Sequence, residues 1–256
     1  MKFEQHLFLS DVHIGAFSDA TNQLIEKDLI SLIKHCQKNK IALYILGDLF
    51  DYWMEYPDQN FVPKLGKKVL NTFEEYNRTV NPALYITGNH DNWTFGHFEE
   101  RGFELEPDYR LFEINNKQFL LMHGDGVSSD TIEFPRAKFH RLLRNSKFVH
   151  YYQKYLSPKV GVNIMKLFSA LTRKRNHSKL KPLNQIAEKL LKEHKLDFIL
   201  TGHDHIPRVE TFSCGSYINL GTFCNHRTVA LYNNEGMQLV TWSATSKNFI
   251  PFEGNN

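Results

Sequence analysis

The chain has 256 residues, of which 41% are apolar, and this content is sufficient for the core of one large domain. Its formal net charge is only +3, and its three cysteines lack the spacing of a zinc site. No apolar run approaches the roughly 18 residues that a membrane-spanning helix needs. These features argue against a disulfide-stabilised scaffold and a membrane-spanning protein, and they predict a cytoplasmic location.

Short apolar runs of strand length recur along the chain, and most of them end in Asp, His or Asn. Helical spacing of apolar residues appears between them, over residues 22–39, 63–77 and 183–195. This alternation predicts an α/β architecture in which the sheet is covered on both sides. Residues 228–243 predict two later strands around an Asn-Asn-Glu-Gly turn. The runs and the motifs that follow them are HLFLS with Asp11-Val12-His13, ALYIL with Gly47-Asp48, ALYIT with Gly88-Asn89-His90-Asp91, QFLLM with His123-Gly124-Asp125, and DFILT with Gly202-His203-Asp204-His205.

The polar residues after these runs are candidate metal ligands. Ligand sites in open α/β sheets lie beyond the carboxyl ends of the strands, so we expect these side chains to converge. We expect the Asp-x-His and His-x-His segments to be extended, with both donors on one side, and the preceding glycines to permit sharp turns. Oxygen and imidazole donors without thiolate suit two divalent ions such as Mn²⁺, Fe²⁺, Co²⁺ or Zn²⁺, which can clamp an in-line attack on phosphorus. The candidates are Asp11, His13, Asp48, Asn89, His123, His203 and His205.

The five motifs DVH, GDLFD, GNHD, HGD and GHDH, in this order, resemble those of the calcineurin-like metallophosphoesterase superfamily. The resemblance runs from Leu7 to about Thr222 and implies a layered α-β-β-α sandwich. It further implies that His90 contacts the phosphate or protonates the leaving oxygen, and that Asp91 orients His90. By the same resemblance, one metal would be held by Asp11, His13, Asp48 and His205, and the other by Asp48, Asn89, His123 and His203, with Asp48 bridging.

A basic segment interrupts this pattern. Residues 134–181 contain thirteen of the 31 Lys and Arg and no acidic residue, which leaves 18 basic against 28 acidic residues elsewhere. The segment has two helix-like halves divided near Ser157-Pro158, with apolar residues recurring along both. We therefore expect one domain over 1–256 with a helical basic insert at about 130–182. Its partner would be a membrane surface, a nucleic acid or a phosphorylated substrate, and an ordinary helical cap is the alternative.

The sequence GDLFDYW, together with an insert between the HGD and GHDH motifs, is similar to the UDP-2,3-diacylglucosamine hydrolases. That resemblance implies a Mn²⁺ enzyme of lipid A synthesis, peripheral on the cytoplasmic face of the inner membrane. It would cleave the pyrophosphate of a UDP-linked acylated glucosamine by water attack, giving UMP and a lipid monosaccharide phosphate, with the insert as a lid. The candidate substrate contacts are Asn89, His90, Arg173, Arg175, Ser178 and Lys179.

One position departs from that family, which has GNRD where this chain has GNHD with His90. Arg offers a permanently charged fork for phosphate, whereas His can donate a proton near neutral pH. Either this chain belongs to a divergent branch of that family that acts on the same substrate, or its substrate differs. The alternatives are a cytosolic metallophosphoesterase acting on nucleotides or nucleic-acid phosphodiesters, and a scaffold without turnover. The filled ligand positions favour an enzyme, and a nucleic acid is not the partner that we expect.

Overall fold

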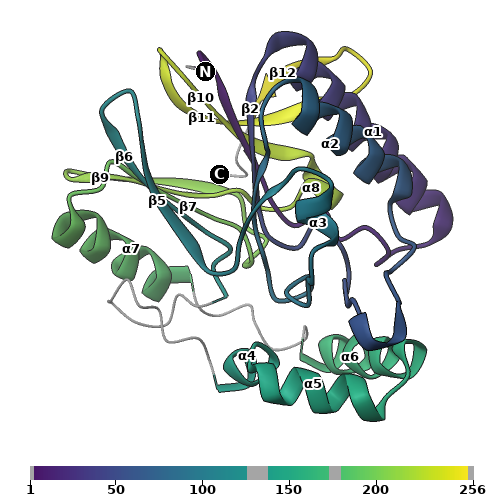
Figure 1. The fold of residues 1–256 in the computed structure, drawn as a ribbon. Coiled ribbons are helices and arrows are strands. Elements are labelled where there is room, and N and C mark those ends of the chain that lie inside the picture. The colour runs from purple at the N-terminus through teal and green to yellow at the C-terminus, as the bar shows by residue number, and fades with distance from the viewer. Residues whose placement is uncertain (1–2, 126–137, 173–179, 253–256) are drawn as a thin grey trace.

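Two β-sheets packed face to face form the centre of the molecule (Figure 1). The computed structural model describes residues 3–125, 138–172 and 180–252. The first sheet has the order β12-β11-β10-β1-β2-β3-β4, with β1 to β4 parallel, and the second has the order β5-β6-β7-β9-β8, with β6, β7 and β9 parallel. The first sheet comprises β1 (His6–Leu9), β2 (Ala42–Leu46), β3 (Leu84–Ile86), β4 (Glu104–Glu106), β10 (Thr228–Asn233), β11 (Gly236–Ser243) and β12 (Asn248–Pro251). The second comprises β5 (Tyr109–Ile114), β6 (Lys117–Met122), β7 (Phe198–Thr201), β8 (Arg208–Phe212) and β9 (Gly215–Asn219).

Helices cover the outer face of each sheet, and three apolar clusters hold the layers together. One cluster joins Leu29 of α1 to Leu43 of β2, and the middle cluster joins Phe8 of β1 to Phe119 of β6. The third packs Leu190 of α7 against β6 and β7. The predicted α-β-β-α layering is therefore confirmed. These helices and the shorter ones are α1 (Asp19–Asn39), α2 (Lys67–Thr79), α3 (His97–Glu100), α7 (Leu180–His194), α8 (Phe223–His226) and the 3₁₀ helix η1 (Pro57–Gln59).

The ends of α1 and α2 follow local chemistry. The Ser18 side chain caps α1 by accepting a hydrogen bond from the Thr21 amide at 3.4 Å, and Asp19 in the first turn complements the helix dipole. Lys40 ends α1 in a left-handed conformation at φ 52°. Helix α2 starts later than the spacing predicts, because Gly66 precedes it in a left-handed conformation at φ 57°.

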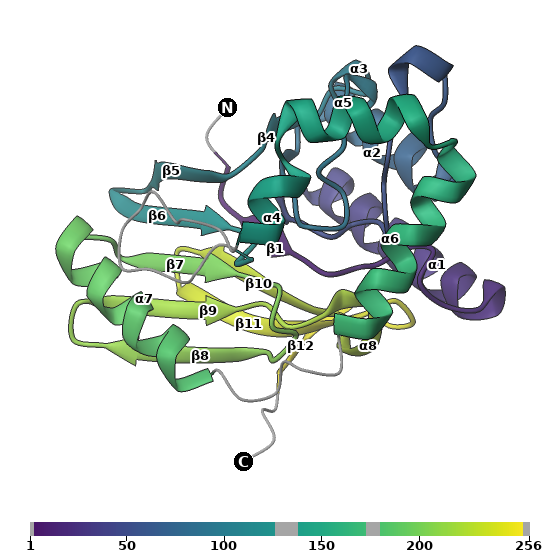
Figure 2. The same ribbon diagram turned by 90° about the horizontal axis from the view of Figure 1, so that it is seen from below.

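The part of the insert that the structure describes, residues 138–172, forms three helices, which lie together at the bottom of Figure 1 and are seen from below in Figure 2. They are α4 (Lys138–Leu143), α5 (Ser146–Tyr155) and α6 (Pro158–Thr172). The predicted division near Pro158 is confirmed, and the first half divides once more after Leu143.

The apolar side of the insert packs on the body of the protein. Leu143, Val149 and Met165 form a separate buried cluster with Tyr56 and Trp93. Within the described ranges, no helix combines the length and apolar character needed to cross a membrane. The candidate substrate contacts Arg173, Arg175, Ser178 and Lys179 lie outside the described residues.

Candidate metal centre

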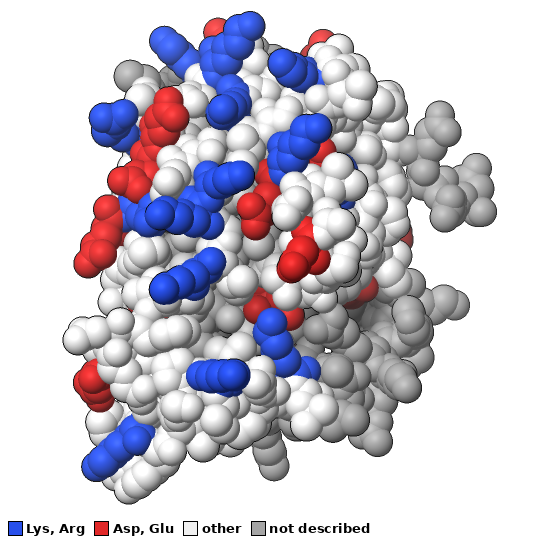
Figure 3. Space-filling view, turned by 90° about the vertical axis from the view of Figure 1, so that its right-hand side faces the viewer, with Lys and Arg blue, Asp and Glu red and all other residues white. Residues whose placement is uncertain are grey.

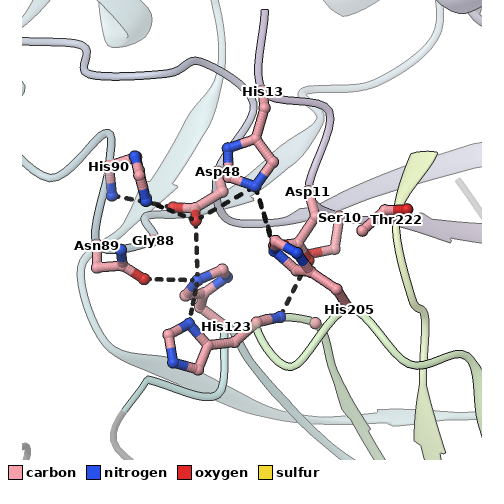
Figure 4. A network of polar contacts seen from close by, with 12 residues as sticks. Ser10, Asp11, His13, Asp48, Gly88, Asn89, His90, His123, His205 and Thr222 are labelled. Carbon is pink, nitrogen blue, oxygen red and sulfur yellow. Dashed lines mark hydrogen bonds and ion pairs between the residues drawn. The ribbon is translucent and has the colours of Figure 1, made fainter. Parts of the chain in front are cut away.

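The carboxyl ends of five parallel strands from both sheets meet at one place, and the predicted ligands follow them (Figure 4). Convergence follows from topology, because β1, β2 and β3 run parallel in one sheet and β6 and β7 run parallel in the other. The ligands are Asp11 and His13 after β1, Asp48 after β2, Asn89 after β3, His123 after β6, and His203 and His205 after β7.

One group of donors surrounds Asp11, whose side chain is fully buried. Its Oδ1 lies 3.0 Å from His205 Nε2 and 3.6 Å from His13 Nε2, and these two nitrogens are 3.3 Å apart. The other oxygen, Oδ2, accepts hydrogen bonds from Ser10 Oγ and from the His203 amide. Oδ1 therefore faces these two imidazoles.

A second group surrounds His123, which is also fully buried. Its Nε2 lies 3.1 Å from Asn89 Oδ1, 3.3 Å from His203 Nδ1 and 3.4 Å from Asp48 Oδ2. Its Nδ1 lies 2.8 Å from the carbonyl oxygen of Leu46. That contact to the backbone fixes the ring so that Nε2 points into the group, as outer partners commonly do for metal-binding histidines.

Asp48 lies between the two groups. Its Oδ2 is 3.9 Å from His13 Nε2 and 3.9 Å from His90 Nε2, while Oδ1 accepts a hydrogen bond from the His90 amide at 3.0 Å. One oxygen atom therefore faces donors from both sides. Three sets of side chains within the described residues bring ligand atoms within 4.8 Å of one another and could hold a metal ion: Asp11 with His13 and His205, His13 with Asp48 and His90, and Asp11 with Asp48 and His123.

Burial and the short distances between carboxylates and imidazoles shift the pKa values of several groups in this centre. Burial opposes ionisation of Asp11 and Asp48, but the neighbouring imidazoles hold the pKa of each carboxyl well below its usual range. At His123, burial is outweighed by the Asp48 carboxylate, which raises the imidazole pKa to about 10. Burial, together with the cationic His123, lowers the pKa of His203 to about 4. A cation bound at His123 Nε2 would compete with this proton, since only the neutral imidazole is a ligand.

The donor set fits divalent cations. Imidazole nitrogens that lie 3.3 Å apart, with carboxylate oxygens close by, form a compact set of donors that a divalent cation could bind. Carboxylate, amide and imidazole donors suit ions of intermediate hardness.

The backbone of the centre differs from the expectation of extended segments. Five of the seven predicted ligands have left-handed backbone conformations: Asp11 at φ 53°, His13 at 50°, Asp48 at 54°, His203 at 70° and His205 at 63°. Asp and His enter this region more readily than bulkier residues, but it is still uncommon outside glycine. The paired donors of DVH and HDH therefore converge because tight turns aim them, and not because alternate side chains of a strand share a face.

Two of the three motif glycines are needed for close contact between the backbone and a carboxylate, and only one is needed for a sharp turn. Gly47 is left-handed at φ 83°, as a sharp turn requires, but Gly88 and Gly202 are not. A Cβ on Gly88 would lie 2.0 Å from Asp48 Oδ1, and one on Gly202 would lie 2.2 Å from Asp11 Oδ2. The backbones at these two positions press against the carboxylates and leave no room for a side chain.

His90 is held by Asp51, the last residue of the GDLFD motif. His90 Nδ1 lies 3.1 Å from Asp51 Oδ1, and both side chains are at least nine-tenths buried. Lys166 of the insert reaches the same carboxylate at 3.8 Å. The sequence offers one signal for this pairing of Asp51 with His90. Asp51 follows Asp48 by three residues after one strand, and His90 follows the neighbouring strand.

The resemblance assigns Asp91 to orienting His90, and the structure shows which groups donate hydrogen bonds to the Asp91 carboxylate. Its Oδ1 accepts a hydrogen bond from the Gly88 amide at 2.7 Å, and its Oδ2 accepts from the Leu49 amide at 2.7 Å and from the Tyr85 hydroxyl. Asp91 is fully buried, and burial raises the pKa of its carboxyl. These hydrogen bonds tie the turn after β3 to the turn after β2.

A two-sheet sandwich with carboxylates and imidazoles gathered at its strand ends is the arrangement of a metal-dependent hydrolase. A model of the calcineurin-like phosphoesterase family matches residues 6–207, so the chain belongs to that family.

Relatives of known name cover most of the chain. A UDP-2,3-diacylglucosamine hydrolase from Edwardsiella ictaluri is 24% identical over 244 residues, covering 91% of this chain and 90% of that protein. One from Escherichia coli is 27% identical over 213 residues, covering 79% and 82%. A solved structure of Yfce, a phosphoesterase from E. coli, aligns at 15% identity with a TM-score of 0.46, covering 98% of this chain and 100% of that one. The expected similarity to UDP-2,3-diacylglucosamine hydrolases is confirmed.

Proposed function

We propose that the protein hydrolyses the pyrophosphate of UDP-2,3-diacylglucosamine, releasing UMP and a lipid monosaccharide phosphate for lipid A synthesis. The observation that carries this proposal is the convergence of two buried donor groups on Asp48, in a chain whose named relatives carry this activity in their names. The names of the relatives indicate the substrate, and the geometry of the two donor groups indicates the type of reaction.

Two divalent ions, with Mn²⁺ as the expected metal, would occupy the two donor groups. When bound, they would activate the attacking water and neutralise charge on the phosphoryl oxygens. The proposed ligands are Asp11, His13, Asp48 and His205 for the first ion, and Asp48, Asn89, His123 and His203 for the second.

His90 is the proposed catalytic residue outside the ligand set. Because Asp51 binds Nδ1, the other nitrogen, Nε2, faces the centre 3.9 Å from Asp48 Oδ2. In the reaction, a bond from the water oxygen to phosphorus forms and the bond from phosphorus to the bridging oxygen breaks. His90 would contact the phosphate or deliver a proton to that leaving oxygen, and Asp51 would stabilise the imidazolium. Asn89 would also contact the phosphate.

The insert offers a surface for the lipid part of the substrate and for the inner membrane. Its exposed face carries an apolar stripe on α6, with Val160 48%, Ile164 45% and Leu167 65% exposed, beside Tyr155 on α5 at 74%. The lower end of the face in Figure 3, where the insert lies, shows Lys and Arg side chains set among uncharged residues. A basic amphipathic surface of this kind binds anionic membrane surfaces.

A hollow of about 650 Å³ between the insert and the body gives room for an acyl chain. Trp93, Phe95, Leu143 and Val149 provide its apolar lining. Arg173, Arg175, Ser178 and Lys179 remain proposed contacts to the phosphate and sugar. On this proposal the protein works at the cytoplasmic face of the inner membrane.

The double substitution Ile164→Glu with Leu167→Glu is expected to release the protein from vesicles that contain anionic lipid. Two charges placed in the apolar stripe oppose insertion into the interface, while neither side chain contacts the metal centre. Flotation of the protein with vesicles measures binding, and hydrolysis of bis-p-nitrophenyl phosphate in their absence should be unchanged. Leu24→Glu is the matched control, because Leu24 is 53% exposed on the remote helix α1. Equal flotation of all three proteins would contradict the membrane assignment.

Hydrolysis itself tests the proposed function. We expect Mn²⁺-dependent release of UMP from UDP-2,3-diacylglucosamine in mixed micelles to exceed hydrolysis of bis-p-nitrophenyl phosphate, and a chelator to abolish both. Removal of the metal leaves the buried carboxylates and imidazoles without the charge that activates water. Rapid cleavage of the diester without UMP release would retain the metal centre and discard the lipid substrate, in favour of nucleotides or nucleic-acid phosphodiesters.

A further inference from the structure

The insert contacts the backbone of the segment that carries Asn89 and His90. Arg144, the residue after α4, donates hydrogen bonds from Nη2 to the carbonyl oxygens of Gly88 at 2.9 Å and Thr87 at 3.2 Å. Its Nη1 donates to the carbonyl oxygen of Pro107 at 2.7 Å and to Thr87 Oγ1 at 3.1 Å. One guanidinium from the insert thus joins the turns that follow β3 and β4.

The neighbouring residue of the insert binds the other end of the same segment. The indole Nε1 of Trp93 donates to the carbonyl oxygen of Leu143 at 2.7 Å. Trp93 is 3% exposed and belongs to the same apolar cluster as Leu143. Two consecutive residues, Leu143 and Arg144, therefore fasten both ends of residues 87–93, which include a proposed metal ligand and the proposed catalytic histidine.

These hydrogen bonds matter because the backbone carbonyl oxygens of Thr87 and Gly88 need donors, and Arg144 supplies them. Strand β3 has only three residues, and Gly88 lies just past its end. Backbone carbonyls in such partly buried positions need donors, and the planar guanidinium supplies several at fixed angles. The Gly88 backbone also touches Asp48, since a Cβ there would meet Asp48 Oδ1 at 2.0 Å. A shift of this segment would therefore displace Asn89, His90 and Asp48 together.

We propose that Arg144 is a positioning residue through which the insert sets the geometry of the metal centre. This inference rests on the proposed two-metal site, and it extends the insert beyond a lid over lipid. Docking of the insert fixes residues 87–93. Loss of the Arg144 contacts therefore weakens the second metal position and slows hydrolysis of every phosphoester, including small diesters that have no lipid part.

The test compares Arg144→Ala, Arg144→Lys and the control Lys147→Ala in the full chain. Lys147 is exposed at the start of α5, three residues beyond Arg144. We expect Arg144→Ala to lose about 10- to 100-fold in affinity at one of two Mn²⁺ positions, the range for partners that orient metal ligands. For bis-p-nitrophenyl phosphate, kcat should fall with KM little changed. Arg144→Lys should recover part of both losses, and Lys147→Ala should match the wild type.

Hydrogen exchange of the amides in residues 87–93, measured on metal-free protein, supplies a readout independent of activity. Amides near Thr87 and Gly88 should exchange faster in Arg144→Ala. Trp93→Phe replaces the indole by a phenyl ring and so removes the N–H donor to Leu143, and amides near residue 93 should exchange faster in that variant. If Arg144→Ala retains two Mn²⁺ positions, wild-type kcat on the small diester and wild-type exchange, the proposal is overturned and the insert is only a lid. If the wild type binds no Mn²⁺, the proposed function fails instead, and the exchange data still decide the role of Arg144.

Discussion

Asp48→Ala is expected to lose both metal and activity. Asp48 Oδ2 faces both donor groups, 3.9 Å from His13 Nε2 and 3.4 Å from His123 Nε2. Its removal also leaves the buried His123 without the carboxylate that balances its charge. We expect turnover of bis-p-nitrophenyl phosphate to fall by more than about 1000-fold, above the loss for a single electrostatic stabiliser. Elemental analysis of the purified variant should show fewer Mn²⁺ per chain than the wild type.

Two further variants separate this effect from general damage. Glu193→Ala removes a carboxylate that is exposed on α7 and forms only a surface ion pair with Lys189 at 3.8 Å, so it should bind metal and turn over normally. Asp48→Asn keeps the shape and loses the charge, so it should resemble Asp48→Ala in metal content. Full Mn²⁺ occupancy in Asp48→Asn would show that Asp48 does not bridge the two positions.

The location of the centre was predictable because it depends on strand order and on the residues that follow strands. Parallel strands place their carboxyl ends at one edge, and the motifs at those ends carry donors in all five cases. The layered packing was predictable for a similar reason, since β1 is buried along its whole length. Both inferences need only the pattern of apolar residues and the rule for ligand sites.

The conformation of the ligands was not predictable in the same way. Asp11, His13 and Asp48 are left-handed although none is glycine, so local preference predicts something else at each position. Tertiary contacts impose these conformations; for example, the Val12 and His13 amides both donate to the Asp48 carbonyl oxygen at 3.0 Å. Such contacts join residues 35 and 36 positions apart, so the sequence of one motif does not reveal them.

The partners of His90 and of its segment were missed for the same reason. Asp91 adjoins His90 in sequence, but the backbone turns its carboxylate toward Tyr85 and Gly88. Asp51 and Arg144 reach the segment from other elements. Adjacency in sequence does not indicate these partners, because a turn after a strand points successive side chains in different directions.

For a diester with an alkoxide leaving group, His90→Ala is expected to lower kcat by about 10²- to 10⁴-fold, the range for a general acid, while Mn²⁺ content stays at the wild-type level. His90 Nε2 is 3.9 Å from Asp48 Oδ2 and Nδ1 is bound by Asp51, so neither nitrogen is needed for the proposed ligand set. Elemental analysis checks the metal, and the exposed His194→Ala on α7 is the control. Loss of metal from His90→Ala would instead make His90 a ligand, as the grouping of His13, Asp48 and His90 permits.

The leaving group separates the two roles open to His90. A nitrophenolate departs without protonation, whereas an alkoxide needs a proton, so a general acid matters far more for an alkyl diester than for a nitrophenyl diester. Equal losses on both esters would mean that His90 binds phosphate, the role for which arginine is the better residue. Asp51→Asn should reproduce part of the alkyl-specific loss, because it removes the charge that stabilises the imidazolium. When the pyrophosphate is cleaved, the sugar phosphate leaves as a stable anion. A general acid at this position would therefore indicate that the site also accepts esters whose leaving groups are poorer than a sugar phosphate.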